Sequence, residues 1–122
     1  YVGSVLHGLG LPFQLVTEFI MIGSVIGGAV ALFLWLRHFV DERASAIGTA
    51  SFLCMPYLLY DLFKRGSVGE VMAIGLCLIS LYAIEAKRRW LIAPAVGLLA
   101  ISHNTLALFF IPVLLGYIVI KK

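Results

Sequence analysis

Long apolar runs separated by short polar breaks make up almost the whole sequence. The runs predict helices over residues 13–39, 44–64, 68–86, 91–102 and 105–120, with residues 1–6 as the tail of an earlier span. A helix needs about 20 apolar residues to cross the hydrocarbon core of a bilayer. The first three runs are long enough for this, which predicts an all-α bundle of transmembrane helices.

The last two runs are shorter and are separated by Ser102-His103-Asn104-Thr105. As one helix, residues 91–120 would measure about 45 Å, which exceeds the roughly 30 Å of the hydrocarbon core. We therefore favour two short spans that meet at residues 102–105 over a single tilted helix. The prediction is a polytopic bundle of about four to five spans, two of them short, forming one transmembrane domain over residues 1–122.

Composition supports lipid as the solvent. Of the 122 residues, 62% are hydrophobic and 12% are charged, and the mean hydropathy is +1.08. Soluble domains average about 45–50% apolar and about 25% charged residues. Because the chain starts at Tyr1 rather than at Met, and ends on lysines directly after an apolar run, we expect it to be an internal segment of a longer protein.

Basic residues in the breaks predict the orientation of the bundle. Lys64 and Arg65 fall on one side of the predicted membrane, and seven basic residues fall on the other. These are Arg37, Arg43, Lys87, Arg88, Arg89, Lys121 and Lys122. Since cytoplasmic loops carry the excess of Lys and Arg, the larger group is predicted to be cytoplasmic. The protein is then predicted to be an integral, multi-pass plasma-membrane protein. The sequence has no basic stripe of the kind that binds nucleic acid, so nucleic acid is not expected as a partner.

Two local patterns predict helix contacts. Gly23 and Gly27 form a GxxxG pair, and Ser24 with Gly28 repeats the spacing, so small residues line one face for a neighbouring helix. At the cytoplasmic end, helical spacing predicts that Glu85 pairs with Arg88 or Arg89, and that Arg37 pairs with Asp41.

The predicted topology brings most of the reactive side chains to the extracytoplasmic face, although they lie far apart in sequence. They are Glu18, Asp61, Arg65, Glu70, His103 and Asn104. Ionisable residues at membrane depth are costly, which makes them candidates for function. No Cys/His spacing suggests a metal site, and no cofactor is expected.

Each candidate also has a structural explanation, and both are kept open. Ser67 and Glu70 have the spacing of a capping box, and Asp61 with Arg65 has that of a helical ion pair. His103 and Asn104 suit a polar turn between two apolar runs, and Glu18 could pair with a neighbouring helix. For Arg65 the functional reading is favoured, because its guanidinium can bind two phosphate oxygens at once.

Two stretches carry a family resemblance. Residues 56–70 read PYLLYDLFKRGSVGE and residues 102–104 read SHN. They resemble the PY…(D/R)xYxRGxxxE and (L/S)SHN signatures of prokaryotic multi-spanning membrane proteins described as "6-pyruvoyl-tetrahydropterin synthase-related domain, membrane protein". That family is similar to GT-C glycosyltransferases and to YfhO-like membrane proteins. The resemblance covers nearly the whole chain and implies a GT-C-like bundle in a bacterial or archaeal plasma membrane.

The resemblance also implies a function, a glycosyltransferase-like protein acting on a polyprenyl-phosphate-linked sugar at the extracytoplasmic face. The partners are then membrane lipids, the lipid-linked donor and other transmembrane helices of the same chain. The catalytic candidates are Glu70, Asp61 and His103, and the substrate-binding candidates are Arg65, His103, Asn104 and Glu18. Two alternatives stay open. One is a transporter or flippase for a lipid-linked or anionic substrate, and the other is a non-catalytic membrane scaffold.

Overall fold

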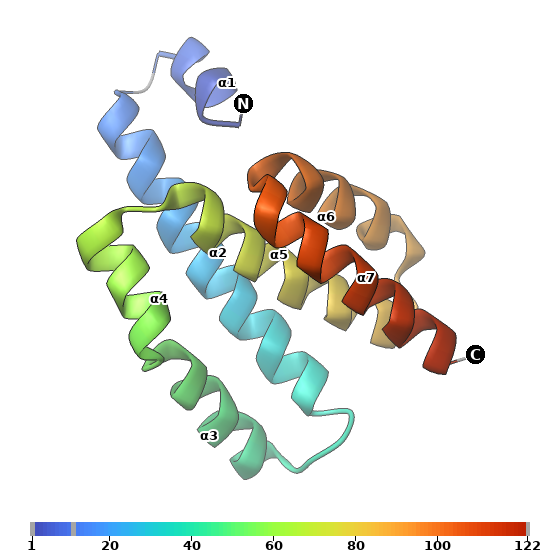
Figure 1. Cartoon of the computed structure of the whole chain (residues 1–122). Helices are drawn as coiled ribbons and strands as arrows, with labels where there is room; N and C mark the ends of the chain where they lie inside the picture. The colour runs from blue at the N-terminus through green and yellow to red at the C-terminus, as the bar shows by residue number, and fades with distance from the viewer. Residues whose placement is uncertain (1, 11, 122) are drawn as a thin grey trace.

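The structure is a computed structural model that describes residues 2–10 and 12–121. Within these ranges the chain is helical throughout, without strands, and short turns connect the helices (Figure 1). The elements are α1 (Val2–Gly8), α2 (Phe13–Leu36), α3 (Glu42–Leu53), α4 (Pro56–Tyr60), the π-helical turn η1 (Asp61–Arg65), α5 (Val68–Glu85), α6 (Arg89–Ser102) and α7 (Asn104–Ile120).

Two helices, α2 and α5, are long and apolar enough to cross a membrane. A third candidate exists if α3 is counted with α4 and η1 as one span, bent by 40° at the break between them. The apolar helices α6 and α7 are shorter. The all-α prediction is therefore confirmed, with two to three candidate spans among the described residues.

The span predicted over residues 44–64 is interrupted, not merely kinked, at Pro56. The α3 helix stops at Leu53, and Pro56 occupies the first turn of α4. Proline suits this position, because its missing N–H is one that a first helical turn leaves unpaired anyway. The break changes the direction of the chain, so that α4 and η1 approach the start of α5 (Figure 1).

The predicted helix over residues 13–39 ends three residues early, at Leu36. The next residues form a tight turn in which the Phe39 and Val40 N–H groups both donate to the Leu36 carbonyl, at 2.9 Å each. Across this turn the Arg37 guanidinium binds Glu42 at 2.6 Å. The predicted pairing of Arg37 with Asp41 is wrong, because Asp41 lies before the start of α3 and Glu42 is its first residue.

The α2 and α5 helices pack against each other in the middle of the bundle (Figure 1). The α3 and α4 helices run along one side of α2, and the α6–α7 hairpin covers the other side of α5. The hairpin returns at His103, so α6 and α7 are two antiparallel helices and not one long one. As a result, the η1–α5 turn and the α6–α7 turn lie at the same end of the bundle.

Small residues bring α2 and α5 into backbone contact. A Cβ atom placed on Gly75 would lie 2.5 Å from the Ser24 carbonyl oxygen, and one on Gly28 would lie 3.0 Å from Gly75 Cα. One placed on Gly23 would meet nothing within 4 Å. The close contact therefore uses the Ser24–Gly28 register, and the Gly23 position of the predicted GxxxG face stays open.

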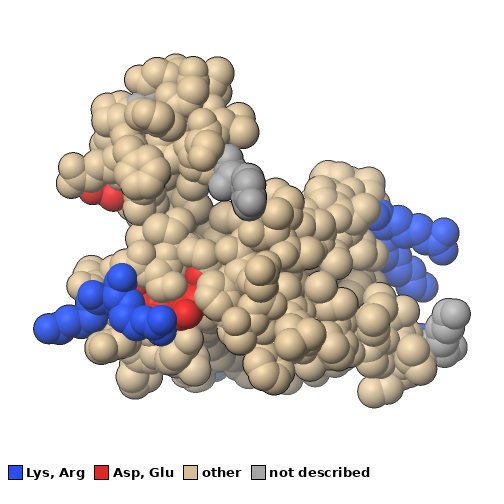
Figure 2. Space-filling model, turned by 45° about the horizontal axis from the view of Figure 1, so that its top comes forward, with Lys and Arg blue, Asp and Glu red and all other residues tan. Residues whose placement is uncertain are grey.

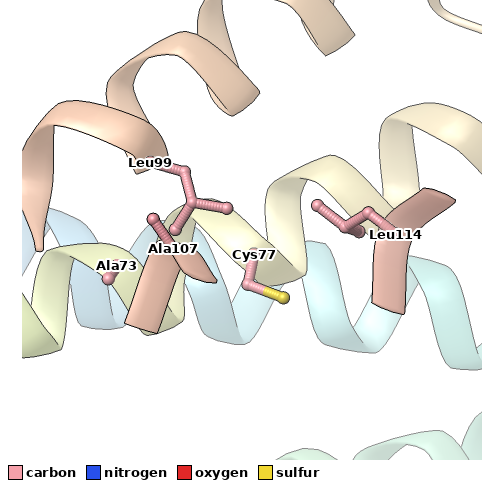
Figure 3. Packing of buried hydrophobic residues seen from close by; sticks show 5 residues of the cluster. All are labelled: Ala73, Cys77, Leu99, Ala107 and Leu114. Atoms are coloured by element: carbon pink, nitrogen blue, oxygen red, sulfur yellow. The ribbon is translucent and has the colours of Figure 1, made fainter. Parts of the chain in front are cut away.

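A small apolar core joins α5 to the hairpin. Figure 3 shows its members, which come from three helices: Ala73, Cys77, Leu99, Ala107 and Leu114. Many large apolar side chains point outward instead, and Phe19, Ile22 and Ile26 on α2 are all more than half exposed. Small residues at helix contacts, with many large apolar side chains on the outer surface, are typical of helices that pack closely within lipid.

A polar cluster closes the end of the bundle that carries most of the basic residues. The Tyr117 hydroxyl donates to Glu85, the Lys121 ammonium binds the same carboxylate, and the Trp35 indole N–H donates to Tyr117 at 3.2 Å. The prediction that Glu85 pairs with Arg88 or Arg89 is wrong. The reason is that α5 ends at Glu85 itself, so the helical spacing to those arginines does not exist.

Candidate functional site

A distorted turn shapes the opposite end of the bundle. The chain widens to one π-helical turn at Asp61–Arg65, a feature often found at functional sites. Gly66 then takes a left-handed conformation with φ +58°, which glycine adopts without strain. The Ser67 N–H donates to the Asp61 carbonyl at 3.2 Å, and the Ser67 side chain makes no capping bond. The predicted capping box is therefore not formed.

Glu70 turns instead toward Arg65. The guanidinium donates from Nη1 to Glu70 Oε2 and from Nη2 to Glu70 Oε1, both at 3.1 Å, which is a two-pronged ion pair. Nη1 also donates to Asp61 Oδ1 at 3.3 Å, so the predicted Asp61–Arg65 pair is present as well. Two carboxylates from η1 and α5 thus fix the position of one guanidinium.

These bonds use three of the five N–H groups of Arg65. Within the described part of the chain, the Nε–H group and the second Nη2–H group make no hydrogen bond. They lie on one edge of the planar guanidinium, and 46% of the side chain is exposed. This free edge has the geometry that binds two oxygens of a phosphate or a carboxylate.

Tyr57 completes the shell around Glu70. Its hydroxyl donates to Glu70 Oε2 at 3.1 Å. Tyr57 is not among the site residues that the sequence predicted, so this contact is an addition to the predicted site. Tyr57, Asp61 and Arg65 are four residues apart, so their spacing could have shown that they share one helical face.

His103 reaches the same carboxylate from the hairpin. It is the N-cap of α7, and its Nδ1 accepts the Leu106 N–H at 3.3 Å. In a neutral imidazole with Nδ1 as acceptor, Nε2 carries the proton. Nε2 lies 3.6 Å from Glu70 Oε1. His103 therefore has both roles that were weighed for it, since it caps the turn and faces the acidic cluster.

Backbone contact holds the two turns together. A Cβ atom on Gly69 would lie 2.8 Å from the Ser102 carbonyl oxygen and 3.6 Å from the His103 ring. Only glycine leaves room for this approach. The first turn of α5 thereby meets the α6–α7 corner, which explains how residues 70 and 103 become neighbours.

Asp61 is the most enclosed member of the cluster. Its side chain is fully buried, and its Oδ2 atom has no hydrogen-bond partner among the described residues. If Asp61 and Glu70 are both ionised, the cluster with Arg65 carries a formal charge of −1. Burial of a carboxylate oxygen without a hydrogen-bond partner costs free energy of folding, so Oδ2 is the atom of the cluster placed to bind a proton.

Two predicted site residues lie outside the cluster. Asn104 is exposed at the start of α7, and Glu18 is exposed on α2; no hydrogen bond or ion pair joins either of them to the cluster in the described ranges. No group of three His, Cys, Asp or Glu side chains in the described residues could hold a metal ion. Figure 2 shows acidic and basic side chains together at one end of the molecule and basic ones alone at the other.

No protein-family model, curated protein or solved structure matches this chain. The class of site therefore follows from its geometry. It is a guanidinium fixed by two buried carboxylates, with one free edge, at one end of a membrane helix bundle.

The site predicts unequal losses of stability for its two acidic residues. In Asp61→Asn the loss of the ion pair with Arg65 is offset because a charge with an unpaired oxygen is no longer buried, so the free energy of unfolding should stay within about 1 kcal/mol of wild type. In Glu70→Gln the amide replaces charged bonds to Arg65, which should cost roughly 1.5–3 kcal/mol. Thermal unfolding of both variants in the same detergent tests this. Equal losses would contradict the assignment of Glu70 as the central acceptor.

Proposed function

We propose that this chain is the membrane domain of a glycosyltransferase-like protein that acts on a polyprenyl-phosphate-linked sugar at the extracytoplasmic face. In this proposal the bundle has four to five spans, with α6 and α7 as the short pair, in a GT-C-like arrangement. The membrane is a bacterial or archaeal plasma membrane. The observation that carries the proposal is the free edge of Arg65, held in place by Asp61 and Glu70.

The position of the site supports a lipid-linked substrate. Arg65 lies just before α5 and Glu85 is the last residue of α5, so the two lie at opposite ends of this helix. The basic loops indicate that the Glu85 end faces the cytoplasm. A phosphate at headgroup depth in the outer leaflet would meet the exposed guanidinium edge at the Arg65 end. Charge-assisted bonds to two phosphate oxygens are the strong contacts that such a group needs.

The proposed step is the transfer of a sugar from phosphate to an acceptor hydroxyl. The acceptor oxygen bonds to the anomeric carbon, the bond from that carbon to the phosphate oxygen breaks, and the electron pair leaves with the phosphate. Arg65 stabilises the negative charge that develops on the leaving phosphate. The acceptor proton passes to a carboxylate.

The geometry distributes the acidic roles differently from the sequence prediction. Both oxygens of Glu70 are occupied by Arg65, and Tyr57 and His103 add to them, so Glu70 is a positioning residue in this proposal. Asp61 is buried, and it serves to position the guanidinium through its Oδ1 atom. Glu18, exposed near the start of α2, is the carboxylate left to take the acceptor proton.

In this proposal the cluster binds a phosphate only when the cluster itself carries no net negative charge. Two ionised carboxylates and one guanidinium would repel a phosphate, whereas one proton on the carboxylate pair makes the cluster neutral. The unpartnered Oδ2 of Asp61 is placed for that proton. In this proposal phosphate binding therefore requires the protonated pair.

A transporter or flippase is the second candidate, supported by two helix breaks. The α3–α4 break is bent by 40°, and the α6–α7 break is lined by His103. Transporters often bind substrates at broken helices. Movement of a labelled lipid phosphate between leaflets of proteoliposomes, without any change in its covalent structure, would favour this candidate over transfer.

Binding of undecaprenyl phosphate, compared with undecaprenol, tests the proposed phosphate site. The full protein in nanodiscs should bind the phosphate more tightly than the alcohol, by roughly tenfold to a hundredfold, since bonds to a charged group contribute about 1.5–3 kcal/mol. Arg65→Lys should remove most of this preference, because lysine lacks the planar fork. The exposed neighbour Lys64, changed to Met, is the matched control. Equal affinity of the wild type for both lipids would refute the proposal.

A further inference from the structure

An apolar cavity lies directly beside the site. It measures about 370 Å³, is lined by α1, α2, α5 and α6, and is open on one side. Most of its wall is apolar, and at one end it reaches the residues that precede Glu70 and His103 in the chain. Its wall includes Val16, Ile20, Met72, Leu98, Gly69 and Ser102. A ligand with an apolar part and a polar end could therefore contact the cavity and the polar cluster together.

Two of the three hydroxyl groups on the wall are already hydrogen-bonded, and the third belongs to Ser4. Thr17 Oγ1 donates to the Phe13 carbonyl at 3.0 Å, and Ser102 Oγ donates to the Leu99 carbonyl at 2.9 Å. Both donors are satisfied within their own helices. Water is poorly held in a cavity that offers it few polar partners. The chemistry of the wall thus favours a hydrocarbon occupant.

The site next to the cavity favours one kind of hydrocarbon. The Gly69–Ser102 contact forms part of the wall. The residues that follow these two in the sequence, Glu70 and His103, belong to the cluster that holds Arg65. The volume falls in the range of about 300–1,000 Å³ that is typical of small-molecule sites. It can hold the part of a lipid chain nearest its headgroup, with the rest of the chain left in the bilayer.

We propose that this cavity binds the phosphate-proximal isoprene units of a lipid phosphate whose headgroup is bound by Arg65. The inference rests on the proposed function, because it assigns the place of the chain that is attached to the proposed phosphate. The cavity then selects among lipid phosphates by the hydrocarbon next to the phosphate. A lipid that is too stiff or too bulky at that point does not fit. Each buried CH₂ group raises the affinity by about fourfold.

Photolabelling of the full protein in nanodiscs tests the cavity. The probe is farnesyl phosphate with a diazirine on the isoprene unit next to the phosphate, and mass spectrometry locates the insertion. We expect label on Ile20, Met72 or Leu98 in the wild type. Ile20→Trp and Met72→Trp fill the cavity and should lower the labelling by roughly tenfold, as loss of a few buried CH₂ groups predicts. Ile26→Trp, on the exposed face of α2, should not.

The outcomes separate the two proposals. Label located away from the cavity in the wild type, or labelling of both filled variants within about twofold of wild type, would overturn the cavity assignment. If that occurs while undecaprenyl phosphate still binds better than undecaprenol, the phosphate site stands, and a neighbouring helix of the same protein fills the cavity. If the wild type shows no phosphate preference at all, both proposals fail.

Discussion

Replacement of Gly75 by valine is expected to separate α5 from α2 and to lower the stability of the whole bundle. Even the Cβ atom would lie 2.5 Å from the Ser24 carbonyl oxygen and 3.4 Å from Ser24 Cα, which are backbone atoms that cannot rotate away. Forcing extra atoms into a packed interface costs about 1–3 kcal/mol, occasionally more. The effect should extend to the site, because α5 also carries Gly69 and Glu70.

Gly23→Ala is the matched control for this prediction. A Cβ atom there meets nothing within 4 Å, and alanine favours a helix over glycine by about 0.8–1 kcal/mol. Thermal unfolding in detergent should therefore show a large loss for Gly75→Val and none for Gly23→Ala. The opposite order would mean that α2 packs through its Gly23 face and that the α2–α5 interface is wrong.

The contrast between these glycines shows what the sequence could and could not predict about packing. The spacing of small residues predicted that one face of residues 13–39 would be approached closely by another helix, and α5 does so. It did not select between the two overlapping registers, because Gly23, Ser24, Gly27 and Gly28 satisfy the same spacing. The choice depends on Gly75, which lies on a different helix about fifty residues later and carries no small-xxx-small signal of its own.

Part of the candidate site was predictable from the charges of the loops, and not from residue spacing. Loop charges placed the η1–α5 turn and the α6–α7 turn at one membrane face, and the contacts of Glu70 with Arg65 and His103 agree with that placement. The direction of the Glu70 side chain was not predictable. A capping box and an ion pair both satisfy the same local spacing, and the π-helical turn at Asp61–Arg65, which decides between them, has no signature in the sequence.

Neutralising Arg65 is expected to destabilise the protein through the carboxylates that it leaves behind. Arg65→Met keeps much of the side-chain volume but removes the positive charge beside Asp61 and Glu70, which are both buried. Breaking a buried pair costs about 3–5 kcal/mol. Because water partly screens the half-exposed guanidinium, we expect a loss smaller than that of a fully buried pair.

A triple variant separates this structural role from the proposed binding role. With Asp61→Asn and Glu70→Gln added to Arg65→Met, no charge remains to be compensated, and most of the lost stability should return. Preferential binding of undecaprenyl phosphate should not return, because the guanidinium edge is absent. Thermal unfolding and the undecaprenyl phosphate comparison, made on the same preparations with Lys64→Met as control, test both statements. A triple variant that regains stability and still prefers the phosphate would show that Arg65 holds the bundle end together without binding the substrate.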